Sequence, residues 1–95
     1  MGHALITAGT KGLGLKVTEG FINEGHSVSI TYFKDLARAE QLQQKFPKAS
    51  IEIIQADVCN KHDLTNAVQK AVKRFGTIDY LINNAGPFIF ERKNW

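Results

Sequence analysis

The chain has 95 residues, enough for one domain with a small hydrophobic core. Apolar residues make up 43% and charged residues 22%, the balance of a folded globular chain rather than a disordered or fibrous one. The formal net charge is +3, and basic residues are interleaved with acidic ones along the chain, which argues against a nucleic-acid partner. No apolar run reaches the ~20 residues of a membrane span and no signal-like segment begins the chain, so we expect a cytoplasmic protein without a membrane partner. The single cysteine, Cys59, cannot form an intramolecular disulfide, and no metal site is predicted.

Strand and helix patterns alternate through the first half of the chain. An apolar run over residues 3–8 predicts a buried strand that ends in a cluster of glycines. Apolar residues at helical spacing over residues 13–24 predict the first helix. Residues 27–32 contain β-branched side chains and predict a second strand. A second helix is expected next, with Asp35 as its cap and Pro47 after its end, because proline cannot continue the helical hydrogen bonds.

The second half of the chain repeats this alternation. Residues 51–56 predict a third strand, and Asn60 predicts the cap of a third helix. A regular apolar stripe carries that helix to Phe75, where Gly76 ends it. Residues 78–83 predict a fourth strand. Alternating strands and helices with short connections predict an α/β fold in three layers, in which helices cover both faces of a parallel sheet.

A glycine-rich loop, segment 7–14 (TAGTKGLG), joins the first predicted strand to the first predicted helix. Unpaired N–H groups and the positive end of the helix dipole can hold a phosphate there. Glycines allow a conformation that a Cβ disfavours, close approach of a pyrophosphate, and close packing of helix on strand. Gly9, Gly12 and Gly14 are the candidates for these tasks. Glycines also serve ordinary turns, so the position between strand and helix gives the pattern its weight.

The loop resembles the T-G-x-x-x-G-x-G loop of the short-chain dehydrogenase/reductase family, and two further segments match that family. Asp57 and Val58 follow the third strand, where the family uses an aspartate for the adenine amino group and the next backbone amide for the ring. Segment 83–86 (NNAG) matches the family's N-N-A-G motif residue for residue. One departure is that Ala8 stands where the family has its first glycine, with Gly9 immediately after, so we expect the first turn to be built differently.

The resemblance implies a fold, a domain and a class of reaction. The fold is half of a Rossmann unit with strand order 3-2-1-4, which leaves the fourth strand at an open edge. Residues 1–95 would then be an NAD(P)-binding domain, the N-terminal part of a longer oxidoreductase. Its substrate would be a small carbonyl or alcohol compound, and the 3-oxoacyl-carrier-protein reductases are the nearest subgroup suggested. The resemblance also implies a homo-oligomer.

The catalytic residues of that family cannot be placed in this chain. The family pairs a tyrosine with a lysine four positions later, whereas Tyr32 is followed at that spacing by Leu36 and Tyr80 by Asn84. We therefore assign no catalytic residue and expect the 95-residue chain to be inactive alone. Two other interpretations stay open: a non-catalytic module that senses NAD(P), and a structural or interaction domain whose glycines serve only turns.

The end of the second strand predicts which nicotinamide cofactor is bound. Enzymes that prefer NAD place a carboxylate there for the ribose hydroxyl, whereas residues 32–34 read Tyr-Phe-Lys. Lys11 and Lys34 could instead bind the 2′-phosphate of NADP(H), so NADP(H) is predicted over NAD. Asp35, directly after Lys34, is a nearby carboxylate that would favour NAD. The residues predicted to bind the cofactor are Gly9, Thr10, Lys11, Gly12, Leu13, Gly14, Tyr32, Phe33, Lys34, Asp57, Val58, Asn84, Ala85 and Gly86.

Overall fold

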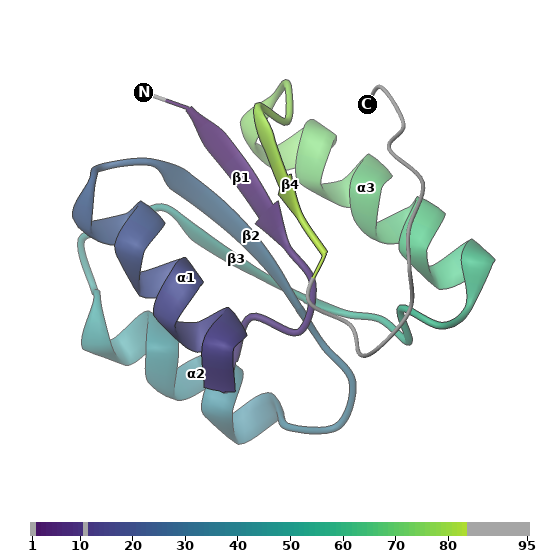
Figure 1. Cartoon of the computed structure of the whole chain (residues 1–95), viewed down its shortest axis with the longest axis horizontal. Coiled ribbons are helices and arrows are strands. Elements are labelled where there is room, and N and C mark those ends of the chain that lie inside the picture. Colours follow the sequence, from purple (N-terminus) through teal and green to yellow (C-terminus); the bar gives the residue numbers. More distant parts are fainter. Residues whose placement is uncertain (1, 11, 84–95) are drawn as a thin grey trace.

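A computed structural model describes residues 2–10 and 12–83, which form a four-stranded sheet with three helices around it (Figure 1). The strands are β1 (His3–Ile6), β2 (Ser27–Tyr32), β3 (Ile51–Gln55) and β4 (Tyr80–Ile82). The helices are α1 (Gly12–Asn23), α2 (Leu36–Lys45) and α3 (Lys61–Phe75). The strand order is β3-β2-β1-β4 and all three pairings are parallel, which confirms the predicted Rossmann half-unit.

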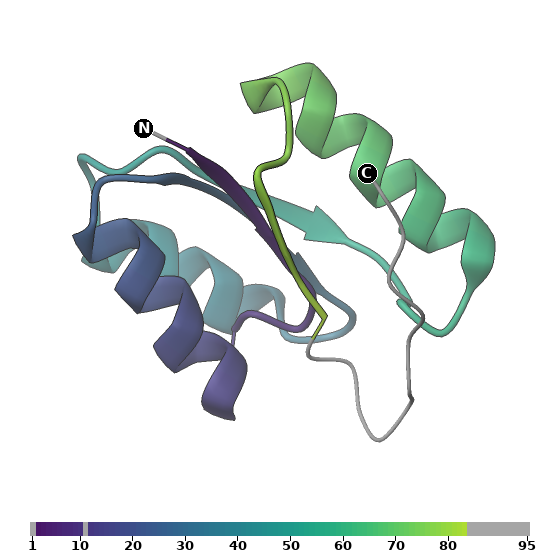
Figure 2. The ribbon, with the colours of Figure 1, turned by 45° about the horizontal axis from the view of Figure 1, so that its top comes forward.

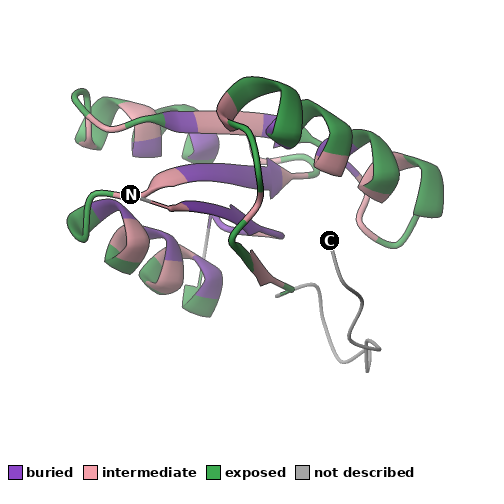
Figure 3. Ribbon diagram, turned by 90° about the horizontal axis from the view of Figure 1, so that it is seen from above, coloured by how far each residue is buried: buried purple, intermediate pink, exposed green. Residues whose placement is uncertain are grey.

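The sheet lies between two helical layers, with α1 and α2 on one face and α3 on the other (Figure 2). One apolar cluster joins Ile22 of α1 and Leu42 of α2 to the strands, and the other joins Ala67 and Ala71 of α3 to them. Buried positions follow the strands and the helix sides that face them (Figure 3). The alternation of strand side chains supplies apolar residues to both clusters, as expected for a parallel sheet covered on both faces.

The helix ends show which predicted caps form hydrogen bonds. The side chain of Asn60 accepts from the backbone N–H groups of His62 and Asp63, as predicted for the cap of α3. Gly76 ends α3 with a φ of 81°, a conformation that suits glycine. Asp35 occupies the predicted N-cap position of α2, where its carbonyl oxygen accepts from the Ala39 amide, but its side chain makes no capping hydrogen bond. Its carboxylate instead lies 3.9 Å from Nε of Arg38, one turn along the helix. None of the described helices combines the length and apolar character that crossing a membrane requires.

Three strands are shorter than their patterns predict, and β3 lacks only the last predicted residue, Ala56. The first was predicted over residues 3–8 and ends at Ile6, because Ala8 leaves extended geometry with a φ of +53°. The fourth was predicted over 78–83 and spans only Tyr80–Ile82. Just before it, the Asp79 carboxylate accepts the His3 amide at 2.8 Å, a bond that strand pairing would otherwise supply. Polar side chains and a left-handed residue therefore set the boundaries of β1 and β4, and apolar periodicity does not report either of them.

A buried polar chain crosses the sheet at the end opposite the glycine loop. His3 is 2% exposed, with its Nδ1 3.2 Å from the carbonyl oxygen of Gly76 and its Nε2 2.8 Å from Oγ of Ser29. Ser29 is fully buried and donates to the Glu52 carboxylate at 3.0 Å. Buried polar groups cost free energy unless they are paired. Ser29 supplies a hydrogen-bond partner to both His3 and Glu52.

Replacing Ser29 by alanine should therefore reduce stability without a change of fold. The substitution leaves Nε2 of His3 buried without its partner, and the free energy of unfolding should fall by about 1–3 kcal/mol. Urea denaturation followed by circular dichroism measures the change. A loss below about 0.5 kcal/mol, the usual range of a surface substitution, would show that these buried hydrogen bonds of Ser29 add nothing to stability.

Candidate functional site

The loops that follow β1, β2 and β3 meet at the carboxyl-terminal edge of the sheet (Figure 1). Hydrogen bonds between residues far apart in sequence join them. The Ala8 amide donates to Oγ1 of Thr31 at 2.9 Å, which ties the first loop to β2. The side chain of Gln55 donates to the carbonyl oxygen of Phe33 at 3.3 Å, which ties the end of β2 to β3. Open parallel sheets bind ligands at this edge.

Gly9 provides the close packing between the loop, α1 and β2. A Cβ on Gly9 would lie 2.7 Å from Oγ1 of Thr18 and 2.9 Å from Cγ2 of Ile30, both shorter than real Cβ contacts. The Thr18 hydroxyl lies within hydrogen-bond distance of the carbonyl oxygens of Gly9, at 3.1 Å, and Gly14, at 2.8 Å. The loop backbone is thus held against the first helix by a buried side chain, and only glycine fits at that point.

Gly12 begins α1 in a different environment. Its φ is +58° and a Cβ there would meet no atom within 4 Å, so the space beside its Cα is open. Leu13, the next residue, is 69% exposed, whereas Gly14 is buried within α1. The start of this helix is consequently open on its outer side.

Ala8, which stands where the family pattern has its first glycine, has a positive φ. It is the one non-glycine residue with positive φ in the described part of the chain, at +53°. In this loop Ala8 thus adopts the left-handed conformation, and Gly9 provides the close packing. For residues with a Cβ this conformation costs roughly 1–2 kcal/mol relative to the right-handed region.

The end of β2 presents an aromatic and a basic side chain. Tyr32 is half-buried and its carbonyl oxygen accepts from the Ala56 amide, which continues the ladder to β3. Phe33 is 53% exposed, and Nζ of Lys34 lies 5.4 Å from the centre of its ring. Lys34 is therefore placed at the edge where the glycine loop also lies.

Asp57 and Val58 follow β3 and are both half-buried. The Asp57 carboxylate accepts from the Cys59 amide at 3.0 Å, and its own amide donates to the carboxylate of Asp63 at 2.9 Å. These bonds fix the turn between β3 and α3. An ionised carboxylate has lone pairs for about four donors, so this contact leaves Asp57 able to accept from an adenine amino group.

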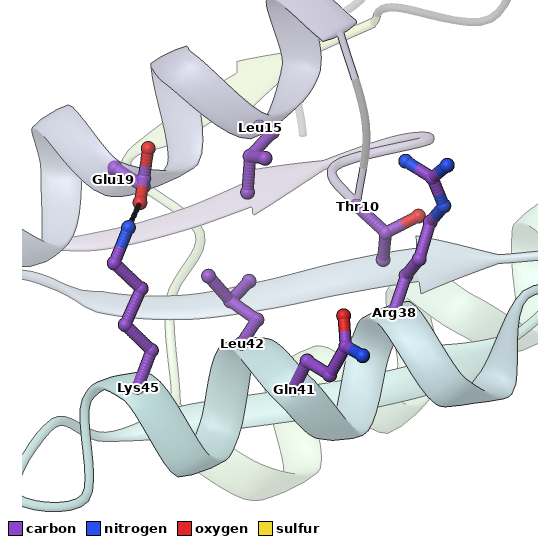
Figure 4. A pocket seen from close by; sticks show the side chains of 7 residues that line it. All are labelled: Thr10, Leu15, Glu19, Arg38, Gln41, Leu42 and Lys45. Atoms are coloured by element: carbon purple, nitrogen blue, oxygen red, sulfur yellow. Dashed lines mark hydrogen bonds and ion pairs between the residues drawn. The ribbon is translucent and has the colours of Figure 1, made fainter.

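A groove with a volume of about 480 Å³ runs between α1 and α2 and reaches the glycine loop (Figure 4). It is lined by Thr10, Leu15, Glu19, Arg38, Gln41, Leu42 and Lys45. Lys45 and Glu19 form an ion pair at 2.6 Å that joins the two helices at one end. At the other end, the side chain of Arg38 extends from α2 toward Thr10. Thr10 is only 5% exposed, so the guanidinium of Arg38 lies beside a buried part of the loop.

Lys11, Asn84, Ala85 and Gly86, four of the predicted cofactor residues, lie outside the described residues. The N-N-A-G segment is described only at Asn83, where Oδ1 accepts from the hydroxyl of Thr7 at 3.0 Å. That bond joins the ends of β4 and β1. Among the described residues, no group of three His, Cys, Asp or Glu side chains is arranged to hold a metal ion.

Three residues that the sequence analysis did not identify lie beside the glycine loop: Thr18, Thr31 and Arg38. Thr18 and Thr31 are buried, but α1 and β2 contain other polar residues, so no pattern in the sequence distinguishes the two threonines. Arg38 gave no signal, because one basic residue on a helix is usually a solvated surface group.

A parallel sheet of order 3-2-1-4, with a glycine loop between its first strand and first helix, defines a Rossmann-type domain. The chain belongs to the short chain dehydrogenase family, whose profile matches residues 2–94.

Known proteins resemble this chain in sequence and in fold. YtkK of Bacillus subtilis, named as an oxidoreductase, is 48% identical over 95 residues, which are 98% of this chain and 37% of YtkK. A structure described as a 3-oxoacyl-reductase from Bacillus thuringiensis is 48% identical, with a TM-score of 0.88 over 98% of this chain and 39% of its own. A blue fluorescent protein from a metagenomic library, in complex with NADPH, is 28% identical, with a TM-score of 0.85 over 93% of this chain and 37% of its own. This chain thus spans less than two fifths of each of these proteins.

Proposed function

We propose that residues 1–95 form the NADP(H)-binding, N-terminal part of a longer oxidoreductase that acts on a small carbonyl or alcohol substrate. The observation that carries the proposal is the glycine loop, which opens α1 at the edge of the sheet where β2 and β3 also end. We further propose that the protein forms a homo-oligomer and that it resides in the cytoplasm. The Bacillus thuringiensis structure described as a 3-oxoacyl-reductase supports a 3-oxoacyl thioester as the substrate to test first.

The start of α1 has the features that a dinucleotide phosphate needs. The first N–H groups of a helix have no partner within it, and the first turn of α1 holds no acidic side chain that would repel a phosphate. The start of α3 differs, since Asn60 accepts from two of its amides and Asp63 brings a negative charge. The open space beside Cα of Gly12 leaves room at the start of α1 for a ligand. Residues 9–14 would hold the pyrophosphate, and the bound cofactor would supply the hydride.

Basic side chains near the loop support NADP(H) over NAD(H). Lys34 directly follows the end of β2, and Arg38 extends from α2 toward Thr10 of the glycine loop. Asp35 lies 3.9 Å from Arg38, but the two side chains are 47% and 57% exposed, and such pairs are weak. A 2′-phosphate would therefore meet two cations there, and the 2′-hydroxyl of NAD(H) would gain little from them.

The proposal is tested by the dissociation constants of NADPH and NADH, measured in parallel by fluorescence. The full-length protein, meaning the longest polypeptide that contains residues 1–95, is used. NADPH should bind at least about tenfold more tightly, as expected for charge-assisted contacts at a partly exposed site. Equal or tighter binding of NADH would contradict the NADP(H) preference. Absence of binding by either cofactor would contradict the function itself.

Arg38→Gln should weaken NADPH binding by about fivefold and leave NADH binding within about twofold. The matched control is Lys70→Gln, which removes one positive charge from an exposed position of α3, on the other face of the sheet. That control should change neither constant. Equal losses for both cofactors in Arg38→Gln would show that the arginine acts through the shape of the loop and not on the 2′-phosphate.

A further inference from the structure

The first turn of the glycine loop requires an external support. Ala8 holds a φ of +53°, a conformation that alanine does not adopt readily by itself. Its neighbours are fixed, because the Thr7 amide donates to the Ile82 carbonyl at 3.0 Å and Gly9 packs against α1 and β2. Something near Ala8 must therefore compensate for the unfavourable backbone conformation.

Thr31 provides that support. Its Oγ1 accepts from the Ala8 amide at 2.9 Å, and the residue is 1% exposed. Amides of successive strand residues point to opposite neighbours, so the Thr7 amide reaches β4 and the Ala8 amide is directed toward β2. Where β1 leaves extended geometry, the threonine hydroxyl takes the place of a backbone carbonyl in the ladder between β1 and β2.

β2 holds the loop from both faces of the sheet. Successive strand side chains point to opposite faces, so Ile30 and Thr31 reach the loop from different sides. Ile30 limits how far Gly9 can move toward the α1 side, and Thr31 fixes Ala8 on the other side. Together these two residues set the path of the backbone just before the start of α1.

We propose that Thr31 is a positioning residue for the cofactor: it holds Ala8 in its left-handed conformation and thereby places the amides of the phosphate loop. This inference rests on the proposed function. Thr31 is 1% exposed, so it would act on the cofactor through Ala8 and not by direct contact.

Four variants of the full-length protein test the inference by their dissociation constants for NADPH, at a temperature where all are folded. Thr31→Val keeps the shape and removes the acceptor, and should weaken binding by about tenfold, the effect of one lost buried hydrogen bond. Thr31→Ser keeps the hydroxyl and should bind within about twofold of the unaltered protein. In the Ala8→Gly background, where positive φ has no Cβ penalty, Thr31→Val should weaken binding by no more than about threefold. Ser29→Ala is the matched control on the same strand: it removes a buried hydroxyl that does not touch the loop, so stability falls and binding stays.

The outcomes separate this inference from the proposed function. If Thr31→Val lowers stability but leaves the NADPH constant unchanged, or if Ala8→Gly does not reduce its effect, the positioning role is wrong while cofactor binding stands. If the unaltered protein does not bind NADPH, the proposed function is wrong. Hydrogen exchange at the Ala8 amide then still reports on the contact: it should become faster in Thr31→Val, and unchanged exchange would overturn the contact itself.

Discussion

Gly9→Ala should lower the free energy of unfolding by about 3 kcal/mol and weaken NADPH binding more than tenfold. The new Cβ would stand 2.7 Å from Oγ1 of Thr18 and 2.9 Å from Cγ2 of Ile30, and neither group is the free end of a long side chain. Thr18 is buried in α1 and Ile30 is buried in β2, so the loop must move away from both. Such a movement also disturbs the bond from Thr18 to the Gly9 carbonyl. Thermal and urea denaturation measure the first effect, and cofactor titration measures the second.

Gly20→Ala is the matched control for this substitution. Gly20 lies on the exposed side of α1, and a Cβ there would meet no atom within 4 Å. Alanine favours the helix more than glycine does, so this variant should gain about 0.5–1 kcal/mol with unchanged NADPH binding. If Gly9→Ala were tolerated as well as Gly20→Ala, the close packing of the loop on Thr18 and Ile30 would not exist in the folded protein.

The sequence predicted the type and order of all the described helices and strands, because each of them has a local pattern. The apolar stripe that ends at Phe75, the Asn60 cap and the stop at Gly76 are contained within a single segment. The strand order followed from the resemblance to the family, and the structure confirms it. Asp35 shows the limit of such rules: its position suits a cap, yet its carboxylate lies near Arg38 and forms no capping bond.

The details of the candidate site could not be predicted, because they depend on residues far apart in sequence. Thr31 meets Ala8 across 23 positions, and the two sides of the groove near Arg38 come from different helices. The loop pattern suggested three glycines for three tasks, but only the structure shows that Ala8 adopts positive φ and Gly9 provides the packing. A one-dimensional pattern reports that glycine is needed in a segment, and the neighbours in space decide which position needs it.

The 95-residue chain should bind NADPH but reduce carbonyl compounds at least about 100-fold more slowly than the full-length protein. A positioned general acid contributes roughly 10²–10⁴-fold to such reactions, and neither tyrosine of this chain has a lysine four positions later. Tyr80 also lies at the wrong end of the sheet, at the start of β4, where its ring packs against Phe21 and His26 at 5.1 and 5.4 Å. The measurement is NADPH absorbance over time with a 3-oxoacyl thioester, after circular dichroism has shown that the chain is folded.

The same assay on the full-length protein decides between an enzyme and a sensor. Turnover by the full-length protein, with binding but no turnover by residues 1–95, is the result expected for a cofactor-binding half whose catalytic groups lie elsewhere. Tight NADPH binding by the full-length protein without turnover of any carbonyl or alcohol substrate would favour the non-catalytic sensor. Rapid NADPH oxidation by residues 1–95 alone would contradict both, because the proton would then come from a group that this chain already contains. Substituting Tyr32 and Tyr80 in turn by phenylalanine would identify that group.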